Sequence, residues 1–261
     1  MSDDLFSVQG KRFFVTGGAS GIGRMLTEGL AARGARVFTC GRKQETINEL
    51  LAELRDKRGY DIVAEPADLS KLSEIERITA RVSAHFGGEL DVLLNNAGAT
   101  WGAPVDEYPE AGWDKVFDLD VKSLFYTTQK CLPLLRKTGR APDAPSRVIN
   151  IGSISGIHYP LDDAWAYHPA KAAVHHLTGT LAHKLAGEGI TVNAIAPGLF
   201  PSKMTAFTMP GGDTSAVSKF IPLGRVGRPS DIVGTVIYLA STAGAYTTGA
   251  IIKVDGGSVL G

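Results

Sequence analysis

The sequence predicts an α/β protein with a doubly wound sheet of seven parallel strands and helices on both faces. Three observations indicate this fold class. Short apolar runs alternate with longer segments of helical period, the rhythm of strands that are joined by crossover helices. A glycine-rich loop directly follows the first apolar run and leads into a helix. The chain of 261 residues is long enough for one large α/β domain with a substantial core.

The expected strands are short apolar runs, because a parallel sheet that is covered on both faces buries its strands. Their number suits a single doubly wound sheet. They are Arg12 to Thr16, Arg36 to Cys40, Asp61 to Glu65, Leu90 to Leu94, Arg147 to Ile151, Thr191 to Ala196 and Ile251 to Val254.

The segments between the strands have helical periodicity. Ile22 to Arg33 is an expected helix, with Met25, Leu26 and Leu30 on one face. A later helix carries apolar residues at Val174 and at three further positions spaced three, four and four apart. We expect both apolar faces to pack against the core. The stretch RKTGRAPDAPSR before the fifth strand is rich in proline, glycine and charge, so it is expected to be a surface loop.

The composition excludes several classes of protein. Hydrophobic residues make up 44% of the chain and charged residues 21%, which is typical of a globular protein. The formal net charge is zero, so no basic surface is available for nucleic acid or anionic lipid. No apolar run approaches the roughly 18 residues of a membrane span, and the start MSDDLFSVQGKR is too polar for a signal peptide. We therefore expect a cytoplasmic protein without nucleic-acid or membrane partners.

Neither a disulfide nor a metal site is expected. In a cytoplasmic setting, Cys40 and Cys131 are expected to be buried small hydrophobic residues. The six histidines lack the spacing of metal ligands, and the adjacent His175 and His176 would point to different sides of a helix.

The glycine-rich loop TGGASGIG, residues 16–23, predicts a dinucleotide site. Its glycines permit a tight turn and let the backbone approach a pyrophosphate, which the N–H groups at the helix N-terminus receive. The three glycines of this pattern are Gly17, Gly21 and Gly23. The strand before the loop and the helix after it supply the context that the motif requires.

The end of the second strand predicts which dinucleotide binds. An acidic residue there would bind an adenosine ribose 2′-hydroxyl, but the chain has Gly41 followed by Arg42 and Lys43. Arginine presents a planar fork to a 2′-phosphate, and no carboxylate repels it. We expect NADP(H). A solvated residue at the start of a helix is the competing interpretation of Arg42.

The pentapeptide YHPAK places Tyr167 four residues before Lys171, which puts the phenol and the ammonium on one helix face. A nearby positive charge favours phenolate, so the pair is suited to proton transfer. Pro169 is tolerated in a first helical turn, which predicts that the pair lies near a helix start.

The chain carries six motifs in the order in which they occur in the classical short-chain dehydrogenase/reductase family. It resembles this family over essentially its whole length. The motifs are TGGASGIG, ADLS at 67–70, NNAG at 95–98, INIGS at 149–153, YHPAK and APG at 196–198. Within the family it is most similar to NADPH-dependent ketoacyl reductases, especially those associated with rhamnolipids, in NNAGATWGAPVDEYP, NIGS, APGLFPSKMT and AGAYTTG.

The resemblance implies a Rossmann-like fold and a set of cofactor contacts. It implies one domain over 1–261, with a dinucleotide-binding half at about 1–150 and a catalytic and substrate-binding half at about 151–261. Asn95 would stabilise the centre of the sheet, and Ser202 replaces a threonine that binds the carboxamide in relatives. The implied cofactor contacts are Gly17, Ser20, Gly21, Ile22, Gly23, Arg42, Asp68, Leu69, Asn95, Ala97, Gly98, Tyr167, Lys171, Pro197, Gly198 and Ser202.

The resemblance also implies the catalytic groups of a carbonyl reductase. Tyr167 would donate the proton, with a pKa that Lys171 and oxidised nicotinamide lower. Ser153 would hydrogen-bond the substrate oxygen. It lies 14 positions before Tyr167, one more than is usual, and Ser155, 12 before, is its rival. We prefer Ser153 because it follows the hydrophobic strand.

One position departs from the family. Relatives often carry an asparagine that holds a water between the lysine and solvent, and Asp120 stands at this position. A carboxylate accepts hydrogen bonds from a water and from an ammonium but does not donate as an amide does. We name Asp120 as a catalytic candidate, and pairing with a nearby cation is the alternative.

Two segments are candidates for the substrate pocket. An apolar, glycine-containing segment stands where the family builds a lid, and an aromatic segment would form the opposite wall. Their lining favours a hydrophobic ketone, although any of these side chains would also suit a core. The lid candidates are Pro201, Met204, Phe207, Met209, Pro210, Gly211 and Gly212, and the wall candidates are His158, Tyr159, Leu161 and Trp165.

The expected function is NADPH-dependent reduction of a 3-oxoacyl thioester or another hydrophobic carbonyl. An alcohol, polyol or steroid dehydrogenase and a non-catalytic dinucleotide sensor are the alternatives. The intact Ser153, Tyr167 and Lys171 disfavour the sensor. The resemblance further implies a homo-oligomer, a tetramer or dimer, built from helix faces and the C-terminal segment TTGAIIKVDGGSVLG.

Overall fold

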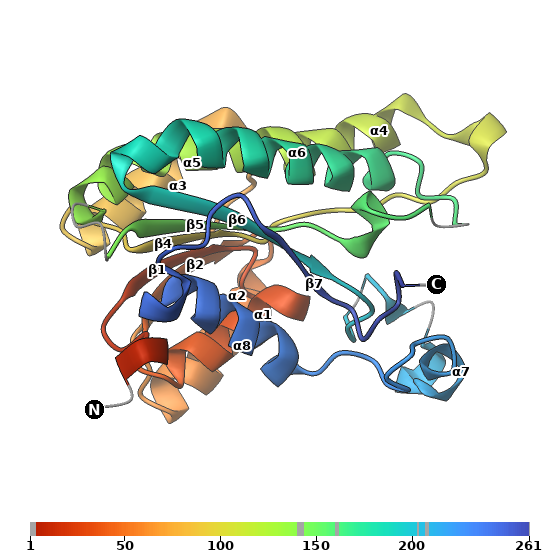
Figure 1. Cartoon of the computed structure of the whole chain (residues 1–261), viewed down its shortest axis with the longest axis horizontal. Helices are drawn as coiled ribbons and strands as arrows, with labels where there is room; N and C mark the ends of the chain where they lie inside the picture. The colour runs from red at the N-terminus through yellow and green to blue at the C-terminus, as the bar shows by residue number, and fades with distance from the viewer. Residues whose placement is uncertain (1–3, 140–143, 160–161, 203, 207–208, 261) are drawn as a thin grey trace.

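The computed structural model describes residues 4–139, 144–159, 162–202, 204–206 and 209–260. Its seven strands form one parallel sheet in the order β3-β2-β1-β4-β5-β6-β7, which confirms the expected fold class (Figure 1). Each expected strand is present, with ends within two residues of those predicted. The strands are β1 Arg12–Thr16, β2 Arg36–Gly41, β3 Ile62–Pro66, β4 Val92–Asn95, β5 Ser146–Ile151, β6 Ile190–Pro197 and β7 Ile251–Val254.

Two layers of helices cover the sheet (Figure 1). One face carries α1 Gly21–Ala31, α2 Gln44–Leu50 and α8 Pro229–Ala240. The other face carries α3 Leu72–His85, α4 Glu110–Phe117, α5 Ser123–Thr138 and α6 Tyr167–Leu185. The short helix α7 Ser215–Ser218 lies apart from both layers. Two π-helical segments extend helices: η2 Leu51–Lys57 continues α2, and η4 Asp118–Lys122 joins α4 to α5.

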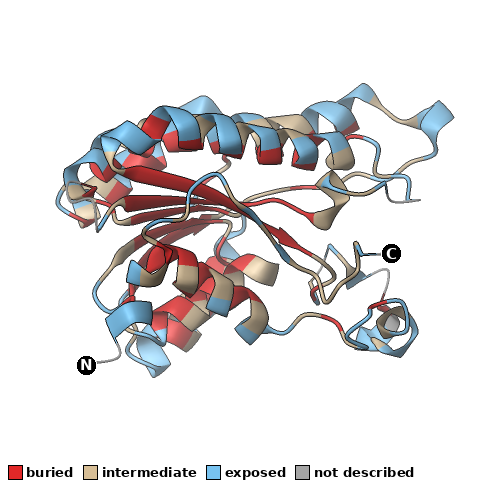
Figure 2. Cartoon of the chain, viewed as in Figure 1, coloured by how far each residue is buried: buried red, intermediate tan, exposed pale blue. Residues whose placement is uncertain are grey.

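The alternation of side chains along the strands explains the two layers. Phe13 and Val15 of β1 belong to the core cluster that includes Leu26 and Leu30 of α1. Phe14 points to the opposite face and belongs to the cluster with residues of α3 and α5. Both clusters are apolar, so the central strands are buried on both faces, as Figure 2 shows.

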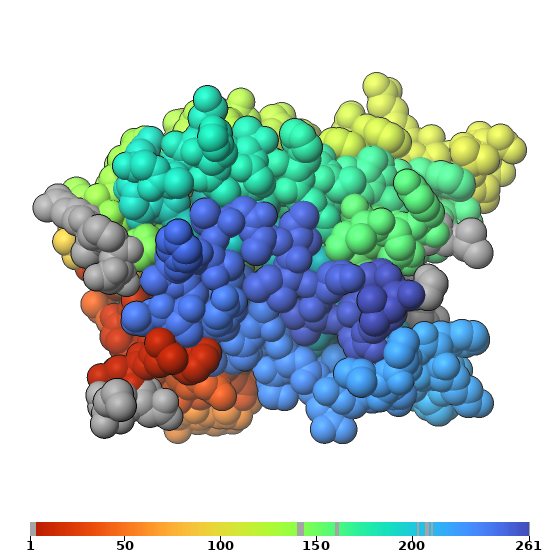
Figure 3. All heavy atoms as spheres, viewed as in Figure 1, coloured from red at the N-terminus to blue at the C-terminus, as the bar shows by residue number. Residues whose placement is uncertain are grey.

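The C-terminal part of the chain covers one side of the molecule. In Figure 3 it runs from α8 across the front to the lobe that carries α7.

The first turn of α8 is fixed by Asp231, whose carboxylate accepts the backbone N–H of Arg228 at 2.7 Å, with Pro229 at the first helical position.

The two cysteines have the buried environment that the composition predicts. Cys40 and Cys131 are free and buried, and burial raises the pKa of each thiol to about 12. No described helix is long and apolar enough to span a membrane. Among the same residues, no cluster of His, Cys, Asp and Glu has the form of a metal site. Of the expected loop before β5, residues 140–143 lie outside the described part.

Candidate active site

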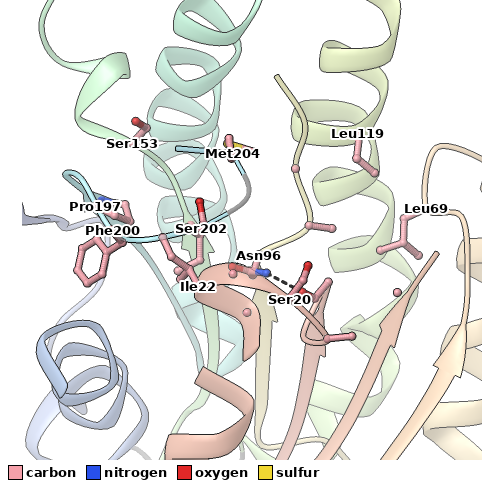
Figure 4. Close-up of a pocket in the computed structure, with 18 of the residues that line it drawn as sticks. Ser20, Ile22, Leu69, Asn96, Leu119, Ser153, Pro197, Phe200, Ser202 and Met204 are labelled. Atoms are coloured by element: carbon pink, nitrogen blue, oxygen red, sulfur yellow. Dashed lines mark hydrogen bonds between the residues drawn. The ribbon is translucent and has the colours of Figure 1, made fainter. Parts of the chain in front are cut away.

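A cavity of about 470 Å³ lies at the carboxyl ends of the central strands. The strand order reverses between β1 and β4, and such a switch point opens a crevice beside the carboxyl ends of the strands. Figure 4 shows side chains from several parts of the chain around it, with Leu69 at one side and Ser153, Pro197 and Phe200 at the other. The sequence-predicted residues that line it are Gly17, Ser20, Gly21, Ile22, Gly23, Arg42, Leu69, Ala97, Gly98, Ser153, Tyr167, Lys171, Pro197, Gly198, Ser202 and Met204.

The glycine loop forms one wall of this cavity. Gly17 and Gly21 have φ angles of 67° and 54°, in the left-handed region that glycine adopts without strain. A Cβ at Gly23 would lie 2.2 Å from the carbonyl oxygen of Gly17, so the loop folds against the start of α1 with no room for a side chain. The first N–H groups of α1 are therefore exposed toward the cavity, where an anion would find donors.

Asn96 fastens the loop to the neighbouring strand. Its side-chain amide donates to the carbonyl oxygens of Thr16 at 3.0 Å and Gly17 at 3.2 Å. The Thr16 hydroxyl in turn accepts the backbone N–H groups of Asn96 and Ala97. These bonds join the ends of β1 and β4, the two strands that flank the crevice.

Arg42 lies at the end of β2, on the rim of the cavity beside Lys43 and Thr46. Its side chain is exposed and forms no hydrogen bond or ion pair with any other residue in the described ranges. The guanidinium is consequently available to a ligand, in keeping with the expected 2′-phosphate contact. An exposed side chain without a partner also fits the alternative, a solvated residue at the start of a helix.

The Tyr–Lys pair lies at the start of α6, as Pro169 predicted. The helix begins at Tyr167, and Lys171 follows one turn later with its Nζ 5.4 Å from the centre of the Tyr167 ring. The ammonium donates to the carbonyl oxygen of Ile151 at 3.1 Å, which ties α6 to the end of β5. Lys171 is 5% exposed, so its charge is almost entirely removed from bulk water.

Ser153 follows β5 by two residues and shares the cavity with the Tyr–Lys pair. Its side chain is near enough to Tyr167 to act on the phenol and lower its pKa in part. Its hydroxyl oxygen also accepts the backbone N–H of Ser155 at 3.1 Å. Ser155 itself does not line the cavity, so the geometry favours Ser153 over its rival.

Asp120 forms a buried ion pair with Lys171, at 3.0 Å between Oδ2 and Nζ. Its other oxygen accepts the backbone N–H of Ala99 at 2.7 Å. The π-helical segment η4 holds the carboxylate at this position between α4 and α5. Burial alone would lower the pKa of Lys171, but Asp120 and Tyr167 outweigh it and raise that pKa above its usual value.

The pKa of Tyr167 does not behave as the sequence predicts. Burial raises it, Lys171 lowers it and Asp120 raises it again, and the net direction is upward. Lys171 lowers the pKa of Tyr167 as expected, but the groups of the chain by themselves leave that pKa above its ordinary value. The physical reason is that burial and the Asp120 carboxylate both oppose the ammonium.

Comparison with known proteins agrees with this geometry. A family model described as enoyl-(acyl carrier protein) reductase matches residues 17–258. A 3-oxoacyl-[acyl-carrier-protein] reductase of rhamnolipid biosynthesis from Pseudomonas aeruginosa is 46% identical, over 97% of both chains. The chain belongs to the short-chain dehydrogenase/reductase family. It is therefore an oxidoreductase.

Two further relatives of this short-chain dehydrogenase/reductase extend the comparison. The 3-oxoacyl-[acyl-carrier-protein] reductase FabG of Thermotoga maritima is 33% identical, over 97% of this chain and 99% of the relative. A solved structure described as the Pseudomonas aeruginosa RhlG/NADP active-site complex is 46% identical and has a TM-score of 0.90, covering 98% of each chain.

Some residues expected in the site of this short-chain dehydrogenase/reductase lie elsewhere. The Asp68 carboxylate is turned to Ser70 and accepts its hydroxyl at 2.8 Å, and Asp68 does not line the cavity. Asn95 is buried within the sheet, where its amide donates to Thr128 and Asn150. It holds the centre of the sheet, as expected, but does not reach the cavity.

Some of the residues that were expected to form the substrate pocket line the cavity, and others do not. Met204 lines the cavity, whereas Met209 is buried in a separate small cluster with Ile221 and Val226. Trp165 donates its ring N–H to the carbonyl of Ala103 at 3.1 Å and does not line the cavity. Pro201, His158 and Tyr159 do not line it either, and Gly211 and Gly212 lie in the turn η8 Pro210–Gly212. Leu161 and Phe207 fall outside the described residues.

Sequence reasoning missed several residues of the site. Asn96 lies inside the NNAG motif, and its position directly after a buried strand was a usable signal. Lys43 and Thr46 line the cavity next to Arg42, and their proximity in sequence also pointed to them. Thr205 bonds the Ser202 hydroxyl at 3.1 Å, a contact within a loop that no periodicity predicts.

Proposed function

We propose that this chain is an NADPH-dependent reductase that converts a hydrophobic ketone, such as a 3-oxoacyl thioester, into an alcohol. One observation carries the proposal: Ser153, Tyr167 and Lys171 line the same cavity as the glycine loop and Arg42. Ketone reduction needs a hydride at the carbonyl carbon and a proton at the carbonyl oxygen, so both donors must share one cavity.

The residues of the cavity fit a phosphorylated dinucleotide. The glycines at 17, 21 and 23 leave room for a pyrophosphate at the start of α1. Arg42 and Lys43 offer positive charge at the end of β2, where a carboxylate for a 2′-hydroxyl is missing. When bound, NADPH supplies the hydride.

The proton comes from the chain itself. Tyr167 donates it to the carbonyl oxygen, while the Ser153 hydroxyl donates a hydrogen bond to the same oxygen and stabilises its developing negative charge. The N–H of Ser155 already occupies part of the accepting capacity of Ser153, which leaves its O–H to donate. Lys171, held between Ile151 and Asp120, stabilises the phenolate that remains.

Further contacts to the cofactor follow from the resemblance and are supported by the lining of the cavity. Pro197 and Gly198 would lie along the nicotinamide, and Ser202 would bind its carboxamide. The other residues in this group are Ser20, Ile22, Leu69, Ala97 and Gly98.

The substrate class rests on the relatives and on the lining. The P. aeruginosa and T. maritima proteins described above are both 3-oxoacyl-[acyl-carrier-protein] reductases. Phe200 and Met204 present apolar surface in the same cavity as Ser153. The raised pKa of Tyr167 favours the reductive direction, because the phenol keeps the proton that it must donate.

We also propose that the chain acts as a homo-oligomer through the strand at the sheet edge. β7 is the last strand of the sheet, and its Ile251 is 42% exposed. An edge strand with exposed apolar residues is suited to pairing with another copy.

Substitution of the proposed acid tests the function. Tyr167→Phe removes the phenolic proton but keeps the ring, so NADPH-dependent reduction of acetoacetyl coenzyme A should fall by roughly 10³-fold. NADPH binding, measured by fluorescence titration, should persist. Tyr246→Phe, at a fully exposed tyrosine, is the matched control and should leave turnover unchanged. Full turnover by the Tyr167→Phe protein would refute the proposal.

A further inference from the structure

Three residues of α6 follow one another at intervals of one helical turn on the face that meets β5. Tyr167 and Lys171 are the first two, and His175 is the third. Burial leaves His175 only 6% exposed, and nothing in the proposed reaction uses it so far. A buried histidine in line with the catalytic pair needs a physical account.

The imidazole of His175 bridges the turn that carries Ser153. Its Nε2 accepts the backbone N–H of Ser153 at 3.5 Å. The backbone of Gly156, at the other end of the turn, acts on the ring as well and raises the pKa of His175 in part. The short 3₁₀ segment Ile154–Gly156 lies between these two contacts. One side chain of α6 thus contacts the start of the turn through a hydrogen bond to the Ser153 backbone.

The packing leaves no room for the turn to move closer to α6. A Cβ at Gly152 would lie 2.1 Å from Nε2 of His175, so the ring rests directly on the backbone before Ser153. A Cβ at Gly156 would lie 2.6 Å from the backbone carbon of Lys171. The imidazole and the helix backbone therefore fix the distance between Ser153 and α6.

The protonation state suits this contact. Burial, and to a smaller extent the charge of Lys171, lower the pKa of His175 to about 4. The ring is neutral at neutral pH and keeps the lone pair that the Ser153 N–H requires. The described residues contain no metal cluster that would compete for that lone pair.

We propose that His175 is a positioning residue. It holds the Ser153 turn at the distance from α6 at which the serine hydroxyl can hydrogen-bond the substrate carbonyl oxygen beside Tyr167. This inference rests on the proposed function of Ser153. It assigns a specific contact to Nε2, which accepts the backbone N–H of Ser153.

Substitutions that replace one nitrogen at a time test the assignment. The side-chain amide of glutamine can occupy the position of Nε2 and accept the Ser153 N–H. The shorter side chain of asparagine reaches only the position of Nδ1. His175→Gln should therefore keep most of the kcat for acetoacetyl coenzyme A. His175→Asn and His175→Leu should lower kcat by roughly tenfold to a hundredfold, with the KM for NADPH unchanged. His176→Leu, at the exposed neighbour, is the matched control and should match the unmodified protein.

A double-mutant cycle with Ser153→Ala separates positioning from a merely structural role. If His175 acts through the serine, His175→Leu should cost little further kcat once the serine hydroxyl is gone. An equal loss in both backgrounds, or equal kcat for the Gln and Asn variants, would overturn the inference. If His175→Leu does not fold, the Gln and Asn variants carry the same cycle. Unchanged kcat in Ser153→Ala alone would instead contradict the proposed function.

Discussion

Asp120 sets the electrostatics of the reacting tyrosine. This chain places a carboxylate 3.0 Å from Lys171, at the position where the family resemblance implies a neutral amide, and both groups are almost fully buried. The ammonium lowers the pKa of Tyr167 and the carboxylate raises it, so Asp120 cancels part of the effect of Lys171. The phenol consequently keeps its proton to higher pH than the Tyr–Lys pair alone would allow.

Replacing this carboxylate should move the pH profile in a defined direction. In Asp120→Asn the charge of Lys171 acts on the phenol unopposed, and the pKa of Tyr167 falls. Ketone reduction needs the protonated phenol, so the alkaline decline of kcat should shift to lower pH. The profile is measured as kcat for acetoacetyl coenzyme A reduction against pH.

The same π-helical segment supplies the control for that experiment. Asp118 is exposed and pairs with Lys122 at 3.1 Å, so Asp118→Asn removes an equal charge away from the tyrosine. Its pH profile should coincide with that of the unmodified protein. An alkaline limb that stays in place or moves upward in Asp120→Asn would contradict the electrostatic role.

At the residue scale, the sequence predicts which residues share the site but not the direction in which their pKa values shift. The motif order predicts Ser153, Tyr167 and Lys171 in one site, because each is tied to a strand end or a helix start. The net pKa direction of Tyr167 depends on burial and on the distance to Asp120, which no spacing along the chain contains. The hydrogen bond of Asp68 to Ser70 is a local turn contact that the motif order does not predict either.

At the scale of elements, β5 and α6 are joined by a column of polar contacts. Asn150, Ile151 and Ser153 bond in turn to Thr178, Lys171 and His175 of the helix. These bonds follow the register of strand against helix. The proposed catalytic residues are therefore positioned by two rigid elements rather than by the mobile part of a loop.

The strands were predictable because each is an apolar run bounded by breakers, whereas the π-helical segment η4 was not. Its sequence, DLDVK, has no feature that separates it from ordinary helix. The wider turn depends on the packing of α4 and α5 around Asp120 and Lys171. Such segments often mark functional sites, and here it holds the residue that departs from the family.

A second buried cation joins β5 to α8. Arg147 is 2% exposed and donates to the carbonyl oxygens of Leu239 at 2.9 Å and Ser241 at 3.1 Å, as well as to that of Pro145. It forms no ion pair within the described residues, and burial lowers its pKa to about 10. The guanidinium thus caps the C-terminus of α8, where carbonyl groups lack helical partners.

Arg147→Met should destabilise the protein without disturbing the cavity. It keeps the apolar stem but leaves buried carbonyls without their charged donor, so the free energy of unfolding should fall by about 2 to 4 kcal/mol. Urea denaturation measures the change, and NADPH titration checks that the site persists. The exposed Arg136, which pairs with Glu188, is the control, and Arg136→Met should cost less than about 1 kcal/mol. Equal stability of the two variants would remove the proposed cap.

At the scale of the whole molecule, two apolar cores enclose a line of buried polar groups. Core clusters lie on both faces of the sheet, while Asn95, Asn150 and Thr178 bond to one another between β4, β5 and α6. Lys171 and His175 continue this line toward the cavity. Sheet topology was predictable from the order of strands and helices, but this polar line was not, because its members come from distant segments and only the folded register aligns them.

His175 should make the stability of the whole molecule sensitive to mild acid. The pKa of His175 is about 4 in the folded chain, below the ordinary histidine value of about 6.5, so the unfolded chain binds a proton that the native chain excludes. Its contribution to stability is therefore complete above about pH 6.5 and is lost progressively as the pH falls toward 4, by about 3 kcal/mol in all. Urea denaturation at pH 7.5 and pH 4.5 should show a smaller difference between the two pH values in His175→Gln than in the unmodified protein. His183→Gln, at an exposed histidine of the same helix, should behave as the unmodified protein does. An undiminished acid sensitivity in His175→Gln would mean that the imidazole is not held neutral against the serine turn.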